Sequence, residues 1–243
     1  MPLDLWTSIL EKTDISTCLA CRNFLAAQSF LKSEQSKRKA VSQIIKTGNQ
    51  EHLELLLGKL GVQGTVKHWQ QAAAAGALQM MLLFERPGVL KKHTPSGLPA
   101  NTFYEPAIIS AAKSGHLCVV EHLRKNYNGD LDRAVAAAAR NNHAEAVKFL
   151  LDKERPASKT FSCQIALQAA SCNGHVQLAE YIFKAYPESR CHGAVFHAVS
   201  GGSVEMVQYY LDHYREAFEA GRYNANIALE SAVHSCQIGR AHV

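Results

Sequence analysis

The sequence predicts an all-α protein built as an α-solenoid of stacked helix-turn-helix repeats. An alanine-rich stretch, a turn and an aliphatic stretch recur along the 243 residues. The turn position recurs at intervals of 28, 39, 27, 32, 28 and 34 residues, which is the spacing of stacked helical repeats. The turn positions are Gly48, Gly76, Gly115, Asn142, Gly174, Gly202 and Cys236. We therefore expect about seven units over residues 40–237, with the last unit incomplete.

Each unit combines a helix of small residues with an amphipathic helix. The alanine and valine run over residues 134–139 is typical of the first helix, and its small side chains let neighbouring backbones approach closely. Glycine or asparagine then tolerates the positive φ that commonly ends a helix. The second helix places apolar residues at i, i+3, i+4 and i+7. These are Val119, Val120 and Leu123; Val147, Leu150 and Leu151; Leu178, Ile182 and Phe183; and Met206, Val207, Tyr210 and Leu211. Stacking of neighbouring units is needed to bury such stripes.

Residues 111–120, 138–147 and 170–179 resemble the two helices of ankyrin repeats, with their alanine pair, Gly-His step and aliphatic positions. The Thr-Pro-Leu-His opening of that family's first helix is missing, and stretches such as 106–109 and 163–166 stand in its place. We therefore expect irregular loops instead of regular β-hairpins. The array is similar in this respect to the divergent ankyrin arrays of protists and large DNA viruses.

The ankyrin resemblance implies a binding surface on the concave face, at the variable pair of residues before each turn. The residues that we predict to contact a partner are Lys46, Lys113, Ser114, Arg140, Asn141, Asn173, Ser200 and His234. Their basic, amide and hydroxyl groups favour a polar or mildly acidic protein partner. The alternative is that each pair is simply solvated.

The first 39 residues do not follow the repeat. Asp4-Leu5, Ile9-Leu10, Asp14-Ile15 and Ala20-Cys21-Arg22 with Phe24 resemble the start of an F-box. The resemblance implies a helical hairpin that binds a Skp-type adaptor and so recruits a cullin ubiquitin ligase. The contact residues it implies are Pro2, Leu3, Leu5, Ile9, Leu10, Ile15 and Leu19. A plain helical cap over the first repeat needs the same apolar spacing, because solenoid ends must be shielded. A charged connector over residues 32–39 is expected to follow.

Two further segments interrupt the repeat. The 39-residue interval includes residues 85–101, where Pro87, Pro95 and Pro99 predict a surface loop. This loop is either part of the binding face or the relic of a degraded repeat. Ile238–Val243 is the translation of a common sequencing-adapter sequence, so we expect these six residues not to belong to the fold.

Composition excludes several classes of protein. The net charge of +5 is too mild to demand nucleic acid. The most apolar stretch, residues 72–84, is shorter than the roughly 20 residues that span a bilayer. No basic and apolar leader opens the chain, so an intracellular protein, cytoplasmic or nuclear, is expected. The seven scattered cysteines are then expected to be reduced thiols.

No metal site or catalytic site is predicted, and no cofactor. Cys18 and Cys21 lack a second ligand pair at zinc spacing. His116, His143 and His175 occupy equivalent positions one repeat apart, about 10 Å, which is too far to share a zinc ion. We expect these histidines to satisfy free N–H groups at the start of the second helix. No glycine-rich phosphate loop, nucleophile elbow or metalloprotease signature occurs in the sequence.

The sequence thus leaves two functions open for a monomeric interaction protein. In the first, residues 1–31 hold a ubiquitin ligase and the array holds its substrate. In the second, the array is a ligase-independent ankyrin scaffold with a plain N-terminal cap.

Overall fold

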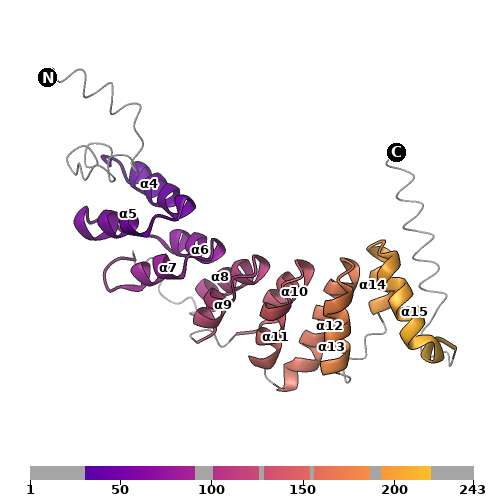
Figure 1. Ribbon diagram of the computed structural model, residues 1–243. Helices are drawn as coiled ribbons and strands as arrows, with labels where there is room; N and C mark the ends of the chain where they lie inside the picture. Colours follow the sequence, from indigo (N-terminus) through magenta and orange to yellow (C-terminus); the bar gives the residue numbers. More distant parts are fainter. Residues whose placement is uncertain (1–30, 91–100, 126–128, 154–155, 187–192, 220–243) are drawn as a thin grey trace, which may run out of the picture. The chain divides into compact units, whose positions relative to one another are not determined.

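The computed structural model describes residues 31–90, 101–125, 129–153, 156–186 and 193–219, and these parts are helical with short connections (Figure 1). The N-terminal segment with its expected adaptor contacts, the last repeat with His234 and Cys236, and the expected tail lie outside the described residues. The chain divides into two compact units, residues 1–107 and residues 108–243.

The first unit contains four α-helices and one π-helical turn within its described residues up to residue 90. They are α4 (Glu34–Thr47), α5 (Gln50–Glu54), η1 (Leu55–Lys59), α6 (Val66–Ala74) and α7 (Leu78–Glu85). Helix α4 packs on α5 and α6, and α6 packs on α7. The N-cap of α4 is Ser33, whose side chain accepts the Ser36 N–H at 3.0 Å. The first helix therefore begins at Glu34, inside the segment expected to be a connector.

The second unit stacks helix pairs in sequence order. Its helices are the end of α8 (Asn101–Lys113), α9 (Leu117–Arg124), α10 (Asp132–Arg140), α11 (Ala144–Lys153), α12 (Pro156–Cys172), α13 (Val176–Ala185), α14 (Ala194–Ser200) and α15 (Val204–Glu219). The first helices of successive pairs pack on one another, α10 on α12 and α12 on α14. They form one layer and the second helices form the other (Figure 1). This stacking confirms the predicted all-α solenoid.

The loops are irregular, as expected. In the described residues, β-structure is limited to one isolated bridge between Gly64 and Leu90, next to a 2.9 Å hydrogen bond from Gly64 N–H to the Val89 carbonyl. The helices on either side of the predicted loop end at Glu85 and begin at Asn101.

The aliphatic stripes form the core of the second unit, with exceptions near its end. The predicted stripe residues of α9 and α11 are completely buried. Met206 and Tyr210 of α15 are buried as well, but Leu211 is 43% exposed and Val207 is half-buried. Phe183 of α13 is also half-buried. The prediction for Leu211 was wrong because it lies on a flank of α15 that no helix of the described part covers.

The turns share one backbone geometry. All six described turn positions have a positive φ, between 60° at Asn142 and 74° at Gly115. After the turn residue, the next N–H donates back to the carbonyl of a first-helix alanine, for example from His116 to Ala111 at 3.0 Å and from His143 to Ala138 at 3.0 Å. This is the six-to-one hydrogen bond of a Schellman helix ending. The same bond closes on Ala72, Ala170 and Ala198, and all five alanines are completely buried.

The histidines after the turns link neighbouring repeats, which corrects the expectation that they cap their own helices. His116 and His175 make no side-chain cap hydrogen bond. Instead, Nε2 of His143 lies 3.0 Å from the Lys113 carbonyl, and Nε2 of His175 lies 2.9 Å from the Arg140 carbonyl. Because a carbonyl only accepts, each Nε2–H must donate. The last carbonyls of a helix have no partner within it, and a side chain from the next repeat supplies one.

The turn at Gly115 is constrained twice. A Cβ there would lie 2.5 Å from Nδ1 of His143, whereas a Cβ at Gly202 would meet nothing within 4 Å. The φ angles are nearly equal, 74° and 70°. The two positions therefore separate the cost of a positive φ from the cost of a steric clash.

We predict that Gly202→Ala lowers the free energy of unfolding by about 1–2 kcal/mol, which is the cost of left-handed backbone for an L-residue. Gly115→Ala should lower it more, because the histidine ring of the next repeat must also move. Urea denaturation of the full chain measures both. In a double variant of Gly115→Ala with His143→Ala, the alanine at 115 should cost no more than Gly202→Ala does, relative to the His143→Ala parent. Equal losses in the two single glycine variants would contradict the role of the ring.

Candidate functional site

The candidate site begins with one face of α10. Arg133, Ala136, Ala137 and Arg140 follow one another at spacings of three, one and three residues, so they share a helix face. Ala136 and Ala137 are 7% and 8% exposed, whereas Ala138 and Ala139 are completely buried. This face is therefore turned away from the core.

A groove of about 510 Å³ lies over this face. Ala136 and Ala137 of α10 line its middle, where their short side chains leave room. Ile109 of α8 and Ile165 of α12, on the neighbouring first helices, line it from either side. The apolar part of the groove is thus low in the centre and higher at both edges.

The polar part of the groove is mainly cationic. Lys113, Arg133 and Arg140 line it together with Asp132 and Asn141, a surplus of two positive charges. We call the surface formed by these five residues and the four apolar ones the α10 groove. Within the described residues, neither Lys113 nor Arg140 forms a side-chain ion pair. Both cations are therefore available to a ligand.

Asp132 is the one carboxylate in the groove, and two opposing influences act on it. Ser162, which is completely buried on α12, donates its hydroxyl to Oδ1 of Asp132 at 2.6 Å. Partial burial raises the pKa of Asp132 above its usual value, while the Ser162 hydrogen bond lowers it and the nearby Asp130 raises it. Burial is the largest of these effects. The carboxylate is held in place at one end of the groove.

The predicted partner-contacting residues lie at the surface, but not in one site. Lys113, Arg140 and Asn141 line the α10 groove. Ser114, Asn173, Ser200 and Lys46 are exposed elsewhere on their own first helices or turns. Their role in binding stays a prediction.

Two of the predicted residues also have a structural role. Nδ2 of Asn141 donates to the Ala137 carbonyl, and Nδ2 of Asn173 donates to the Ala169 carbonyl, both at 2.8 Å. These amides close the last turn of their helices, so they are less free to bind a ligand than the lysine and arginine side chains.

Sequence reasoning missed five groove residues: Ile109, Arg133, Ala136, Ala137 and Ile165. A signal was present for α10, because Arg133 and Arg140 stand seven residues apart, two helical turns, with alanines between them. Assigning every alanine to packing concealed it. No signal in the sequence identifies Ile109 and Ile165 as partners of that face, since they belong to other repeats.

Exposed aromatic residues lie on the next first helices. Phe161 of α12 is 59% exposed and stands four residues before Ile165, so the two share a helix face. Phe196 of α14 is 41% exposed and stands six residues before its turn glycine, as Ala136 does before Asn142. The first-helix face of this unit is therefore basic at α10 and more apolar at α12 and α14.

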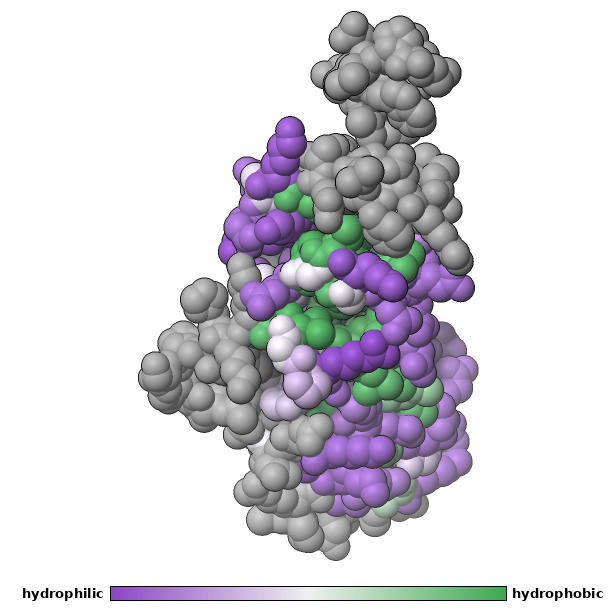
Figure 2. Space-filling model, turned by 90° about the vertical axis from the view of Figure 1, so that its left-hand side faces the viewer, coloured by the Kyte–Doolittle hydropathy of each residue, from purple (hydrophilic) through white to green (hydrophobic). Residues whose placement is uncertain are grey.

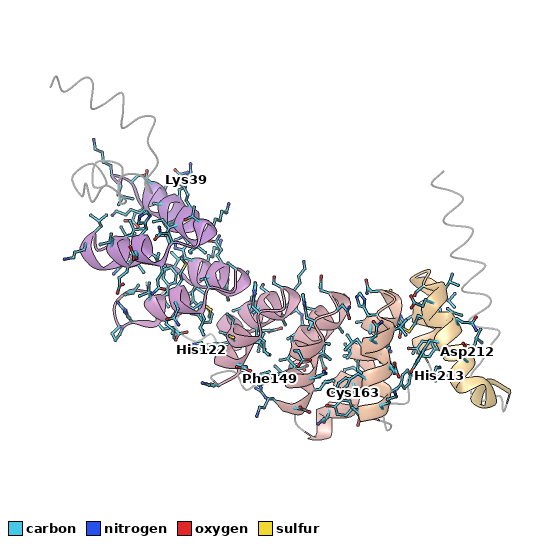
Figure 3. All side chains as sticks on the ribbon, viewed as in Figure 1. Lys39, His122, Phe149, Cys163, Asp212 and His213 are labelled. Atoms are coloured by element: carbon cyan, nitrogen blue, oxygen red, sulfur yellow. The ribbon has the colours of Figure 1, made fainter. Side chains whose placement is uncertain are left out.

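The first unit has a similar basic surface on α4. A hollow of about 360 Å³ is lined by Arg38, Lys39, Ser42 and Lys46, with Gln35 and Gln43. Lys39 and Lys46 stand seven residues apart, like Arg133 and Arg140. Lys39 projects from α4 in Figure 3. Figure 2, which views the side of α4 and α5, shows hydrophobic surface interrupted by hydrophilic side chains.

The described residues contain few other candidates. No group of three or more His, Cys, Asp or Glu side chains among them is placed to hold a metal ion. In the same residues, no helix is long and apolar enough to cross a bilayer. Cys163 is 1% exposed, and burial raises the pKa of its thiol to about 11, so this thiol is unreactive. Figure 3 shows it within the packing of α12.

Comparison with protein families addresses the segment that carries the α10 groove. Residues 108–192 match the family model for ankyrin repeats, with three copies. These residues are ankyrin repeats. The ankyrin segment runs from within α8 to the end of α13 and beyond it, and it contains every residue of the α10 groove. Ankyrin repeats are typically non-catalytic binding modules with protein partners. No curated protein matches the chain.

We predict that Ser162→Ala raises the pKa of Asp132 further, because it removes the hydrogen bond that favours the ionised carboxylate. Titration of the Asp132 carboxyl carbon by NMR in both proteins measures this. In the wild type, a folded pKa above the unfolded one means that this group's contribution to stability decreases as pH rises between the two values. A pKa for Asp132 that is unchanged or lower in Ser162→Ala would contradict the assigned role of the hydroxyl.

Proposed function

We propose that this chain is a monomeric protein–protein interaction module that holds a polypeptide partner on its first-helix face. The observation that carries the proposal is the α10 groove, where cations without ion pairs surround a short apolar depression. Such a combination gives a partner both apolar contact area and fixed polar groups. The ankyrin repeats that build the groove support the same function.

The architecture suits binding without rearrangement. Arg133 and Arg140 project from a helix packed between two others, α11 and α12, so their backbone positions are set before a partner arrives. A preorganised surface avoids part of the ordering cost of association. The exposed Phe161 and Phe196 extend the same face with large apolar side chains, which are favoured at binding interfaces.

We further propose that residues 1–31 connect the array to a ubiquitin ligase. The support for this finer proposal is the N-terminal sequence, in which Asp4-Leu5, Ile9-Leu10 and Cys21-Arg22 resemble an F-box. The array would then hold the ligase substrate. The alternative is a ligase-independent scaffold, in which the N-terminal residues shield the end of the array.

Photo-crosslinking tests which face binds. We predict that benzoylphenylalanine placed at Lys113 or Ser200, one at a time, crosslinks the full chain to a discrete polypeptide in cells. Both positions are exposed on first helices. The same group at Cys118 or Gln177, which are exposed on second helices, should give no such product. Mass spectrometry then identifies the crosslinked polypeptide. Equal products from both faces, or products from the second helices only, would contradict the proposed face.

Adaptor binding tests the finer proposal separately. We predict that the full chain co-purifies with a Skp-type adaptor and that changing Leu5 and Ile9 to Asp abolishes this. The reason is that apolar contacts carry such docking and a carboxylate placed in them loses its hydration. Circular dichroism should show unchanged helix content, because the array does not include these residues. Failure of the wild-type chain to bind the adaptor would leave the scaffold as its function.

A further inference from the structure

The charges of the α10 groove have a spacing that matches an extended peptide. Arg133 and Arg140 lie seven residues apart on one helix face, which is about 10 Å at 1.5 Å per residue. In an extended chain, residues three apart are also separated by about 10 Å. Two carboxylates three residues apart can therefore meet both arginines at once, and Lys113 adds a third cation to the groove.

The apolar centre of the groove accepts a side chain between those charges. Ala136 and Ala137 leave a depression there, and Ile109 and Ile165 line it from the neighbouring helices. An aliphatic side chain that enters this depression is removed from water on several sides. Each buried methylene group contributes about 0.8 kcal/mol.

We propose that the α10 groove binds an extended acidic segment of the protein partner, with two carboxylates three residues apart and an aliphatic side chain between them. The carboxylates pair with Arg133 at one end and with Arg140 and Lys113 at the other. The aliphatic side chain lies on Ala136 and Ala137. This inference rests on the proposed function and specifies the chemistry of the partner.

The lining of the groove favours a polypeptide over a nucleic acid. The residues that line it include no aromatic side chain, whereas single-stranded nucleic acids are typically bound by stacking bases on aromatic rings. Asp132 would also repel a phosphate backbone that followed α10. A peptide avoids this repulsion if its carboxylates lie toward Arg140, Lys113 and the outer side of Arg133.

The test is selection from a random dodecapeptide library on the full chain, followed by affinity measurement with the enriched peptides. We expect enrichment of peptides that carry acidic residues three apart with Leu, Ile or Val between them. A variant with both Lys113→Glu and Arg140→Glu should bind these peptides at least about tenfold more weakly, since each lost charge-assisted hydrogen bond removes over 1 kcal/mol. Lys125→Glu, at the end of α9 in the second-helix layer, is the matched control and should leave the affinity unchanged.

A gain-of-affinity variant excludes misfolding as the explanation. Asp132→Asn removes the one negative charge of the groove while the amide oxygen still accepts from Ser162. It should increase the affinity of the acidic peptides by about threefold, because a partly screened repulsion is lost. An unfolded or distorted groove could only lose affinity.

Several outcomes would overturn the proposal. Enriched peptides without an acidic excess, or acidic peptides whose binding is unaffected by the double variant, would show that the groove does not select carboxylates. If those peptides still crosslink from Lys113 or Ser200, the proposed function stands and only the inference fails. Absence of any enriched peptide, or binding of a 20-nucleotide single strand that the double variant abolishes, would also overturn it.

Discussion

The hydrogen bond that closes each turn on a buried alanine is the constraint on which the second unit depends. The donor is the residue after the turn, so the turn residue must take a positive φ, and glycine fills the position in all described turns except that of Asn142. The acceptor is the carbonyl of an alanine that lies at the contact between first helices. A larger side chain there would separate neighbouring helices. One bond therefore accounts for both the alanine run and the glycine that follows it.

The same constraint produces the candidate binding surface. First helices that pack through alanine lie close together, and the outward face of α10 is low because it too is alanine. The residues able to rise above it are the long ones at the ends, Arg133 and Arg140, and the isoleucines of α8 and α12. The groove is thus a consequence of how the helices pack, with charge placed around it.

The fold was predictable from the sequence because its signals are local. The turn residue, the alanine before it and the stripe after it all fall within about ten residues, so Gly115, Ala111 and Val119 reveal one unit without any knowledge of its neighbours. The groove and the histidine bonds were not predictable in this way. His143 bonds to Lys113 and Ile165 faces Ala136 across about thirty residues of sequence, and these pairings depend on how one repeat lies against the next. For the candidate site, the sequence indicated Lys113, Arg140 and Asn141 but not the surface that they share.

Lys113 and Arg140 each separate two tasks between main chain and side chain. Their carbonyl oxygens accept the histidine bonds that join adjacent repeats, while their side chains face the groove. Any residue type supplies the same carbonyl, so the connection between repeats does not depend on which side chain stands there. Natural variation at these two positions is therefore free to change what the array recognises without altering how it is assembled, and an engineer has the same freedom.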